Sequence, residues 1–250
     1  MQNDYLITQK PLKALIFFSL PMIIGNLFQQ AYTMADSAIV GRLVGENALA
    51  AVGAAYSLTN IFICIAIGGG IGASVIVSQY FGQGNYGKLK KAIYTALLSF
   101  LVISTLLGGF GHVFSKNIMR ALNTPAEVLD MAVTYLKIYF LGLPFLFMYN
   151  VLSSMFNALG KSRIPLYFLI FSSVFNIILD WIFVADFHLD VAGVAWATLI
   201  AQGVSVVGSF TVLLKVLGKL EGNADGIFAP EELLPMTRIA LPSILQQSTV

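Results

Sequence analysis

The sequence predicts an all-α membrane protein built as a bundle of six transmembrane helices. Of its 250 residues, 58% are hydrophobic and only 10% are charged, and the mean hydropathy is +0.83. This composition leaves too little polar surface to cover a soluble globule. The charges also fall in clusters that leave six long uncharged tracts, at 14–35, 47–87, 92–115, 138–160, 164–179 and 191–214.

Each uncharged tract is the centre of one expected helix. An α-helix rises about 1.5 Å per residue, so roughly 20 apolar residues cross the hydrocarbon core of a bilayer. The expected helices cover residues 12–40, 48–80, 91–113, 128–158, 164–185 and 190–216. The first begins near Lys10 and Lys13 and lacks a short apolar core followed by a small-residue cleavage site. We therefore expect a retained helix and not a signal peptide.

The basic residues predict how the helices cross the membrane. Ten of them fall at alternate ends of successive helices, namely Lys10, Lys13, Lys88, Lys90, Lys91, Lys161, Arg163, Lys215, Lys219 and Arg238. The opposite ends carry only Arg42, Lys116, Arg120 and Lys137, whose long side chain is expected to reach the outer interface. The positive-inside rule then predicts a multi-pass protein of the cytoplasmic (inner) membrane with a cytoplasmic N-terminus. Membrane lipid is the expected surrounding, and the absence of a basic stripe with interleaved aromatic residues argues against a nucleic-acid partner.

The last part of the chain predicts a second structural unit. Residues 1–218 hold the six helices, and residues 219–232, KLEGNADGIFAPEE, are polar and turn-rich, which is typical of a cytoplasmic linker. Residues 233–250 become apolar again and predict the start of a seventh helix. Within it, the pair Leu241-Pro242 repeats Leu20-Pro21 of the first helix. The match is short, and chance is the alternative to a second six-helix copy in the same orientation.

Two aspartates lie on membrane helices and predict a polar site. A carboxylate costs at least ~2.5 kcal/mol at mid-membrane, so Asp36 and Asp180 are expected to be paired, hydrated or functional. Both fall in the outer halves of helices that run outward. Asn176 lies four residues before Asp180, on the same helical face. On the returning helix, Thr198 follows Asp190 by eight residues, which places it at a similar depth.

This group of four oxygen-bearing side chains suits a small ion. Carboxylate, amide and hydroxyl oxygens can bind sodium, and two nearby carboxylates repel when both are ionised, which makes a proton a natural ligand. The alternative from spacing alone is two interfacial acids, an asparagine that packs helices and a threonine bonded to its own helix. His112 and His188 have no Cys or Glu partner at ligand spacing. No cofactor, and no metal beyond sodium, is therefore expected.

Further polar residues on the apolar helices predict a pocket for amphipathic small molecules. They are Asn26, Gln29, Gln30, Tyr139, Asn150 and Asn157, and helix packing is the alternative role for each. Pro21 lies inside the first expected helix, where it removes a backbone hydrogen bond. We expect Pro21 to act as a hinge of that helix.

Four stretches, in order along the chain, resemble the multidrug and toxic compound extrusion (MATE) family. They are MADSAIVGRLVGENALAAVG, VSQYFGQGNYGKLKKA, FNALGKSRIPL and FNIILDWIFV. The resemblance implies twelve helices in two six-helix lobes, of which this chain would supply the first lobe and the start of helix 7, with the second lobe missing from it. It also implies an antiporter, not an enzyme, that exports drug-like compounds, often cationic, in exchange for protons or sodium.

The resemblance also implies roles for the four polar residues. Asp36, Asn176, Asp180 and Thr198 match the cation or proton site of the first lobe, with Asp36 as the coupling carboxylate whose occupancy bends the first helix near Pro21. Two rival functions remain. A lipid-linked oligosaccharide flippase predicts a cationic cavity, but the helices carry no cluster of Arg or Lys. An intramembrane aspartyl protease predicts a Gly-x-Gly-Asp motif, which neither aspartate has.

Overall fold

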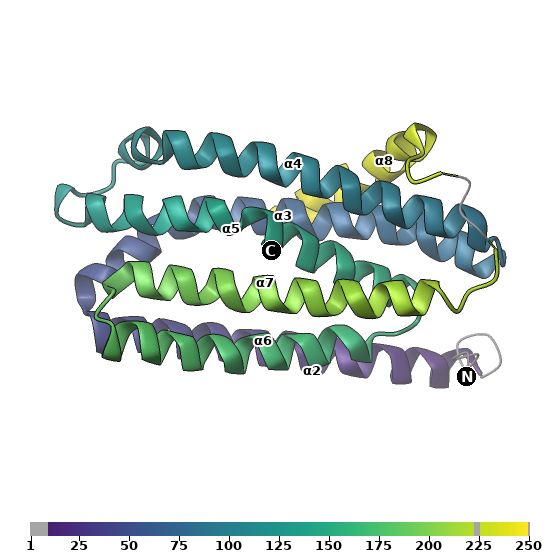
Figure 1. Ribbon diagram of the computed structural model, residues 1–250, viewed down its shortest axis with the longest axis horizontal. Coiled ribbons are helices and arrows are strands. Elements are labelled where there is room, and N and C mark those ends of the chain that lie inside the picture. The colour runs from purple at the N-terminus through teal and green to yellow at the C-terminus, as the bar shows by residue number, and fades with distance from the viewer. Residues whose placement is uncertain (1–9, 223–225, 250) are drawn as a thin grey trace.

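The computed structural model describes residues 10–222 and 226–249 of the chain. Within these ranges the secondary structure is helical and contains no strand. Six helices are long and apolar enough to cross a membrane, and they lie side by side along the long axis of the molecule (Figure 1). The predicted all-α bundle of six membrane helices is confirmed.

The helices follow the order expected from the uncharged tracts. The first span joins α2 (Pro11–Ile39) to a π-helical turn, η1 (Val40–Val44), and the fifth joins α6 (Arg163–Trp181) to a second π-helical turn, η2 (Ile182–Asp186). The other spans are α3 (Glu46–Gly82), α4 (Tyr86–Ala121), α5 (Ala126–Ala158) and α7 (Asp190–Leu217). A further helix, α8 (Pro230–Ser248), follows α7.

The ends of the helices depart from the sequence prediction. The helix expected at 91–113 begins at Tyr86, because the side chain of Asn85 accepts a hydrogen bond from the backbone N–H of Lys88. Hydropathy marks the part of a helix inside the bilayer, and this helix continues beyond it at both ends. The start of α8 falls within the predicted linker, since Pro230 and the acidic residues after it suit a first helical turn. Residues 223–225 of that linker lie outside the described residues.

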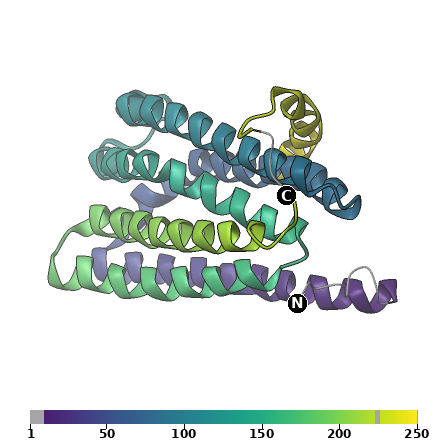
Figure 2. The ribbon, with the colours of Figure 1, turned by 45° about the vertical axis from the view of Figure 1, so that its right-hand side comes forward.

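Consecutive spans run in opposite directions, so the basic segments gather at one end of the bundle (Figure 2). The start of α2, the α3–α4 turn, the α5–α6 turn and the segment after α7 all lie there (Figure 1). They carry Lys10, Lys13, Lys88, Lys90, Lys91, Lys161, Arg163, Lys215 and Lys219. We call this end the basic end. The basic residues that the sequence places at alternate helix ends therefore lie together at one end of the bundle.

The core lies around α3 and α5. Helix α5 supplies the largest fully buried side chains, Phe140, Phe147 and Phe156, and it packs against α3, α4 and α7. Helix α2 packs mainly on α6 and leaves much of its apolar surface exposed, including Leu15 and Leu27. Because α2 is held from one side, it is the membrane helix with the fewest packing constraints on its position.

Glycines in the middle of α3 allow neighbouring helices to approach closely. A Cβ atom on Gly70 would lie 2.5 Å from the Ser154 hydroxyl of α5. A Cβ atom on Gly68 would lie 2.5 Å from the backbone nitrogen of Ile244 on α8. The glycine-rich run therefore serves close helix packing, since a side chain at either position would push the neighbour away.

Candidate ion and substrate site

The structure brings the four predicted site residues together from three helices. Asp36 comes from α2, Asn176 and Asp180 from α6, and Thr198 from α7, and α6 packs against both of the other helices. Asp180 is fully buried and Asn176 is 2% exposed. A charged side chain is almost never fully buried unless it has a partner, so this burial calls for one.

The amide of Asn176 links the members of this group. With its nitrogen towards Tyr32 and Asp180, it donates hydrogen bonds to Asp180 Oδ2 at 3.0 Å and to Tyr32 Oη at 2.7 Å. Its oxygen then accepts from Thr198 Oγ1 at 3.3 Å and from the Thr198 backbone N–H at 3.1 Å. This orientation satisfies both ends of the amide, whereas the reverse orientation points its oxygen at a carboxylate oxygen.

The carboxyl groups of Asp36 and Asp180 lie within hydrogen-bonding reach of each other. Oδ1 of Asp36 and Oδ1 of Asp180 are buried, and neither has a hydrogen-bond partner in the described part of the chain. Two carboxyl groups can share a hydrogen bond only when one of them carries a proton. The pair therefore offers a place for a proton, or for a cation that neutralises both groups.

Each aspartate is followed closely by a π-helical turn. The backbone N–H of Val40, in η1, bonds to the carbonyls of Asp36 and Ser37, and η2 begins two residues after Asp180. Such turns inside α-helices are frequent at functional sites. An apolar cluster of Val40, Ala48, Val184, Val191 and Val194 packs the two turns against α3 and α7. This cluster holds the helix ends next to the carboxyl pair.

Two tyrosines belong to the site and are missing from the sequence prediction. Tyr32 lies one helical turn before Asp36, and its hydroxyl contacts the Asn176 amide. Tyr135, on α5, is close enough to interact electrostatically with both carboxyl groups. The four-residue spacing of Tyr32 and Asp36 is a sequence signal for the first of them. Nothing local to the sequence indicates that α5 brings Tyr135 to this place.

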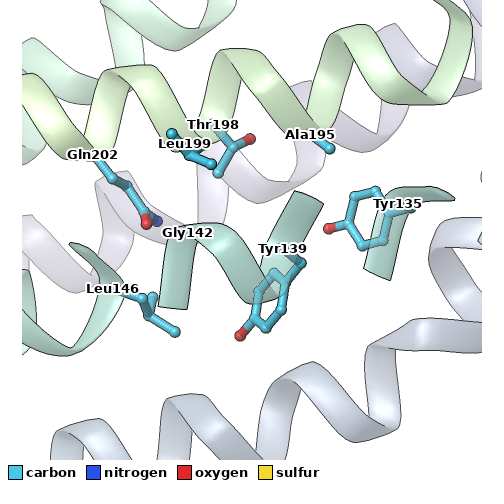
Figure 3. Close-up of a pocket in the computed structure, with 8 residues that line it drawn as sticks. All are labelled: Tyr135, Tyr139, Gly142, Leu146, Ala195, Thr198, Leu199 and Gln202. Carbon is cyan, nitrogen blue, oxygen red and sulfur yellow. The ribbon is translucent and has the colours of Figure 1, made fainter. Parts of the chain in front are cut away.

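Two small cavities adjoin this group of residues, both at Thr198 and the second also at Asn176. Figure 3 shows the first, which is lined by Tyr135, Tyr139, Gly142, Leu146, Ala195, Thr198, Leu199 and Gln202. The second is lined by Gln29, Tyr32, Tyr149, Leu169, Ser172, Ser173, Asn176, Thr198, Ala201 and Gln202. Thr198 and Gln202 line both. The carboxyl pair is therefore connected to these cavities through Asn176 and Thr198.

The predicted pocket residues divide between these cavities and other places. Gln29 and Tyr139 line a cavity, whereas Asn26 and Gln30 are exposed on α2 and line neither. Asn150 donates to the Leu146 carbonyl of its own helix at 2.8 Å and also lines neither cavity. Asn157 also lines neither cavity, and its Oδ1 is buried without a hydrogen-bond partner among the described residues.

Pro21 lies inside α2, which continues as a helix on both sides of it. Because proline has no N–H, the carbonyl of Phe17 loses its helical partner. Ser162, before α6, donates a hydrogen bond to the neighbouring carbonyl of Phe18 at 3.1 Å. The part of α2 before Pro21 is thus tied to the α5–α6 turn, and the role of Pro21 as a hinge stays a prediction.

The chain is similar to curated multidrug resistance proteins over most of its own length. It is 32% identical over 203 residues to the probable multidrug resistance protein YpnP of Bacillus subtilis (strain 168), covering 81% of this chain and 46% of the relative. It is 31% identical over 226 residues to the probable multidrug resistance protein YoeA of the same organism, covering 87% and 48%. The chain spans about half the length of these curated relatives.

A solved structure and a family model point to the same kind of protein as these relatives. A solved structure described as the outward-facing conformation of a multidrug resistance MATE family transporter of the MOP superfamily matches with a TM-score of 0.90. It is 25% identical and the match covers 99% of this chain and 55% of that one. The MatE family profile matches residues 21–182. The chain belongs to the MATE (MatE) family of membrane transporters.

Proposed function

We propose that the chain forms the first lobe of an exporter of amphipathic, often cationic, compounds that is coupled to an inward flow of protons. The observation that carries the proposal is the pair of the half-buried Asp36 and the fully buried Asp180, next to Asn176 and Thr198 of the adjoining cavities. The relatives named multidrug resistance proteins support drugs as the substrates. A second lobe, which the relatives' length leaves room for, completes the transporter.

The position of Asn176 between the carboxyl pair and the second cavity offers a way for drug and proton to compete. Asn176 donates to Asp180 Oδ2 and also lines that cavity, so a cationic substrate bound there lies close to the pair, and its positive charge favours the ionised carboxyl groups. Conversely, a proton shared by the two carboxyl groups removes one of the two negative charges that attract a cationic substrate. Each ligand therefore weakens the binding of the other, which is the requirement for exchange.

The orientation of the Asn176 amide favours the proton over sodium. A sodium ion between the carboxylates needs further oxygen ligands around it. In the orientation that gives both ends of the amide a partner, its nitrogen faces Asp180 Oδ2 and its oxygen is engaged by Thr198. Sodium could enter only after this amide turned round and gave up those bonds. We propose that protons alone sustain transport and that sodium competes for the same pair.

The cavities suit amphipathic cations. Tyr135 and Tyr139 stack with their ring centroids 6.4 Å apart, and Gln202 supplies an amide to the same cavity (Figure 3). Aromatic faces attract organic cations, and a few polar groups in an apolar cavity fix a ligand's orientation. We propose that the residues of this cavity and of the second cavity, which adds Gln29 and Tyr149, form part of the drug site, which opens further when the helices move apart.

The side of the membrane that the basic end faces sets the direction of transport. We propose that this end faces the cytoplasm, as the positive-inside rule predicts. The carboxyl pair lies towards the other end, since Asp36 is close to the end of α2 and Asp180 close to the end of α6. Protons from outside would reach the pair directly. Loss of charge there would let α2, which packs mainly on α6, shift beyond Pro21.

The test is proton-driven uptake of a fluorescent organic cation into inverted vesicles that contain the two-lobe protein. We expect uptake when the vesicle interior is acidified, in the absence of sodium, and no uptake by the Asp36→Asn variant at equal expression. Uptake by the wild-type protein that ignores the pH gradient contradicts proton coupling. An absence of uptake for a panel of organic cations contradicts drug export.

A further inference from the structure

We propose that the seam between α4 and α5, at the end of the bundle opposite the basic end, binds an anionic phospholipid through His112, Lys116 and Lys137. In the orientation proposed above this is a lipid of the outer leaflet, and its binding does not depend on drug export. Helix α4 lies at the edge of the bundle and packs mainly on α5 and α3 (Figure 1). Exposed side chains along its seam with α5 therefore face the membrane.

The basic residues at this end of the bundle are clustered. Of the four that the sequence places there, Lys116 and Arg120 belong to α4 and Lys137 belongs to α5, and all three are exposed. His112, Lys116 and Arg120 follow one another at steps of four residues, so they lie along one face of α4. Basic residues are sparse on the outer side of membrane proteins, so three on one helix pair call for a local reason.

A hydrogen bond brings the two helices together at this cluster. His112 Nδ1 lies 3.0 Å from the Lys137 carbonyl oxygen. A carbonyl oxygen only accepts, so Nδ1 carries the hydrogen and donates it. The contact places His112 and Lys137 at one level of the bundle, and Lys116 follows about 6 Å further along α4. An imidazole and two long ammonium side chains therefore lie within about one helical turn along the seam.

This level is where the hydrocarbon core of the bilayer ends. The uncharged tract of α4, 92–115, ends between His112 and Lys116. The uncharged tract of α5, 138–160, begins directly after Lys137. The hydrocarbon core thus ends at the same place on both helices, and the phosphate groups of the lipids lie just beyond it. Lysine side chains that start at this boundary reach the phosphates while their stems stay against apolar surface.

The surface on the core side of the cluster suits an acyl chain. Leu141, one turn inward from Lys137, is 46% exposed, and Leu101 on α4 is 42% exposed. Gly109 is exposed between them in depth, and a Cβ atom there would meet nothing within 4 Å. The seam therefore offers apolar surface directly below the basic groups, which is the arrangement of a phospholipid.

The basic groups of the cluster have no partner of opposite charge in the described part of the chain. The one ion pair there joins Lys91 to Glu231 at the basic end. Glu127 and Asp130 are exposed on α5, but the nearer of them is seven residues, or about 10 Å, further out than Lys137. Unpaired cations at the membrane surface favour an anionic headgroup. A phosphodiester without an ammonium of its own, as in phosphatidylglycerol, therefore fits better than phosphatidylcholine.

The experiment measures which lipid lies against the seam. In the two-lobe protein, Trp181→Phe and Trp196→Phe remove the natural tryptophans of this chain, tryptophans of the second lobe are replaced likewise, and Leu141→Trp supplies a reporter. Vesicles contain phosphatidylcholine and phosphatidylglycerol, of which one is brominated, because brominated acyl chains quench a tryptophan that they contact. We expect phosphatidylglycerol to be favoured about fivefold at this reporter.

The matched reporter is Ile178→Trp in the same background. Ile178 is 51% exposed near the end of α6 away from the basic end, and the only basic residue of α6 is Arg163 at its start. We expect about equal quenching by the two lipids there. An equal preference for phosphatidylglycerol at both reporters would reflect general attraction to the protein and overturns the proposal.

Charge variants then identify the groups that bind. With the Leu141→Trp reporter, the double variant Lys116→Gln, Lys137→Gln should lose the preference, whereas Lys137→Arg should keep it. Arg42→Gln is the control, because it removes a basic residue at the same end but outside the seam. An undiminished preference in the double variant overturns the proposal. If that variant fails to fold, the comparison of the two reporters still decides.

A last arm separates a lipid from free phosphate. We expect millimolar inorganic phosphate at constant ionic strength to leave the preference unchanged, because the acyl chains hold the lipid at the seam. Loss of the preference would mean that the cluster takes soluble phosphate, and it overturns the lipid site. None of these measurements uses drug uptake, so a failure of the proposed export would leave their result unaffected.

Discussion

Asp36 on α2 and Asp180 on α6 bring their carboxyl groups within hydrogen-bonding reach although 144 positions separate them in the chain. They meet where the two helices pack together and just before each ends in a π-helical turn. The buried amide of Asn176 joins this pair to Tyr32 and Thr198, which line the adjoining cavities. The predictions that follow depend on this arrangement.

Neutralising either acid should abolish drug export. Asp36→Asn and Asp180→Asn keep the shape of the side chain but remove the charge that binds a proton. We expect both variants to be expressed near the wild-type level and to lose resistance to a toxic organic cation in cells. Asp186→Asn is the matched control, because Asp186 is exposed beyond the site on the same membrane span. Resistance at the wild-type level in both site variants would remove the pair from the coupling mechanism.

Sodium should not be required for transport. At a fixed pH gradient we expect uptake in sodium-free medium, and a decline as sodium is added, because sodium competes for the same carboxyl groups. The measurement is the initial rate of cation uptake over a series of sodium concentrations at constant ionic strength. Uptake that stops without sodium and follows a sodium gradient would reverse the assignment of the ion.

Two adjacent glycines of α4 should respond in opposite ways to alanine. A Cβ atom on Gly108 would lie 2.6 Å from the Phe140 carbonyl oxygen of α5, whereas one on Gly109 meets nothing within 4 Å. We expect Gly108→Ala to lower the free energy of unfolding by about 1–3 kcal/mol through overpacking. Gly109→Ala should raise it by up to about 1 kcal/mol, because alanine favours a helix. Thermal unfolding in detergent, followed by circular dichroism, measures both. Equal shifts in the two variants would contradict the described α4–α5 packing.

The attachment of α8 should weaken in acid. A hydrogen bond from its own backbone and the nearby Lys91 ammonium hold the pKa of Glu231 below its usual value of about 4.5. A lowered folded-state pKa means that the stabilising contribution is present above about 4.5 and is lost as the pH falls through the lowered value. The difference in melting temperature between wild-type protein and Lys91→Met should therefore be small at neutral pH and vanish in stronger acid. A difference that grows as the pH falls would contradict this ion pair.

The six-helix bundle could be predicted from the sequence because the length of each apolar stretch and the positions of the charges can be read directly along the chain. Asp36, Asn176, Asp180 and Thr198 could be grouped by their depth along helices, and the structure places them together. Depth does not give the rotation of a helix about its axis, so it could not identify Tyr135. The contact of Gly72 with α8 was also out of reach, since it depends on how two distant segments pack.

The most direct test of the account is to count the protons released when a drug binds. The purified two-lobe protein is mixed with a saturating organic cation in weakly buffered, sodium-free solution near neutral pH, and a pH-sensitive dye records the change. Because one proton serves the pair, we predict release of up to about one proton per drug bound by the wild-type protein. We predict no release by Asp36→Asn or Asp180→Asn. Drug binding by the wild-type protein without proton release, or undiminished release by both variants, would contradict the claim that this pair exchanges a proton for the drug.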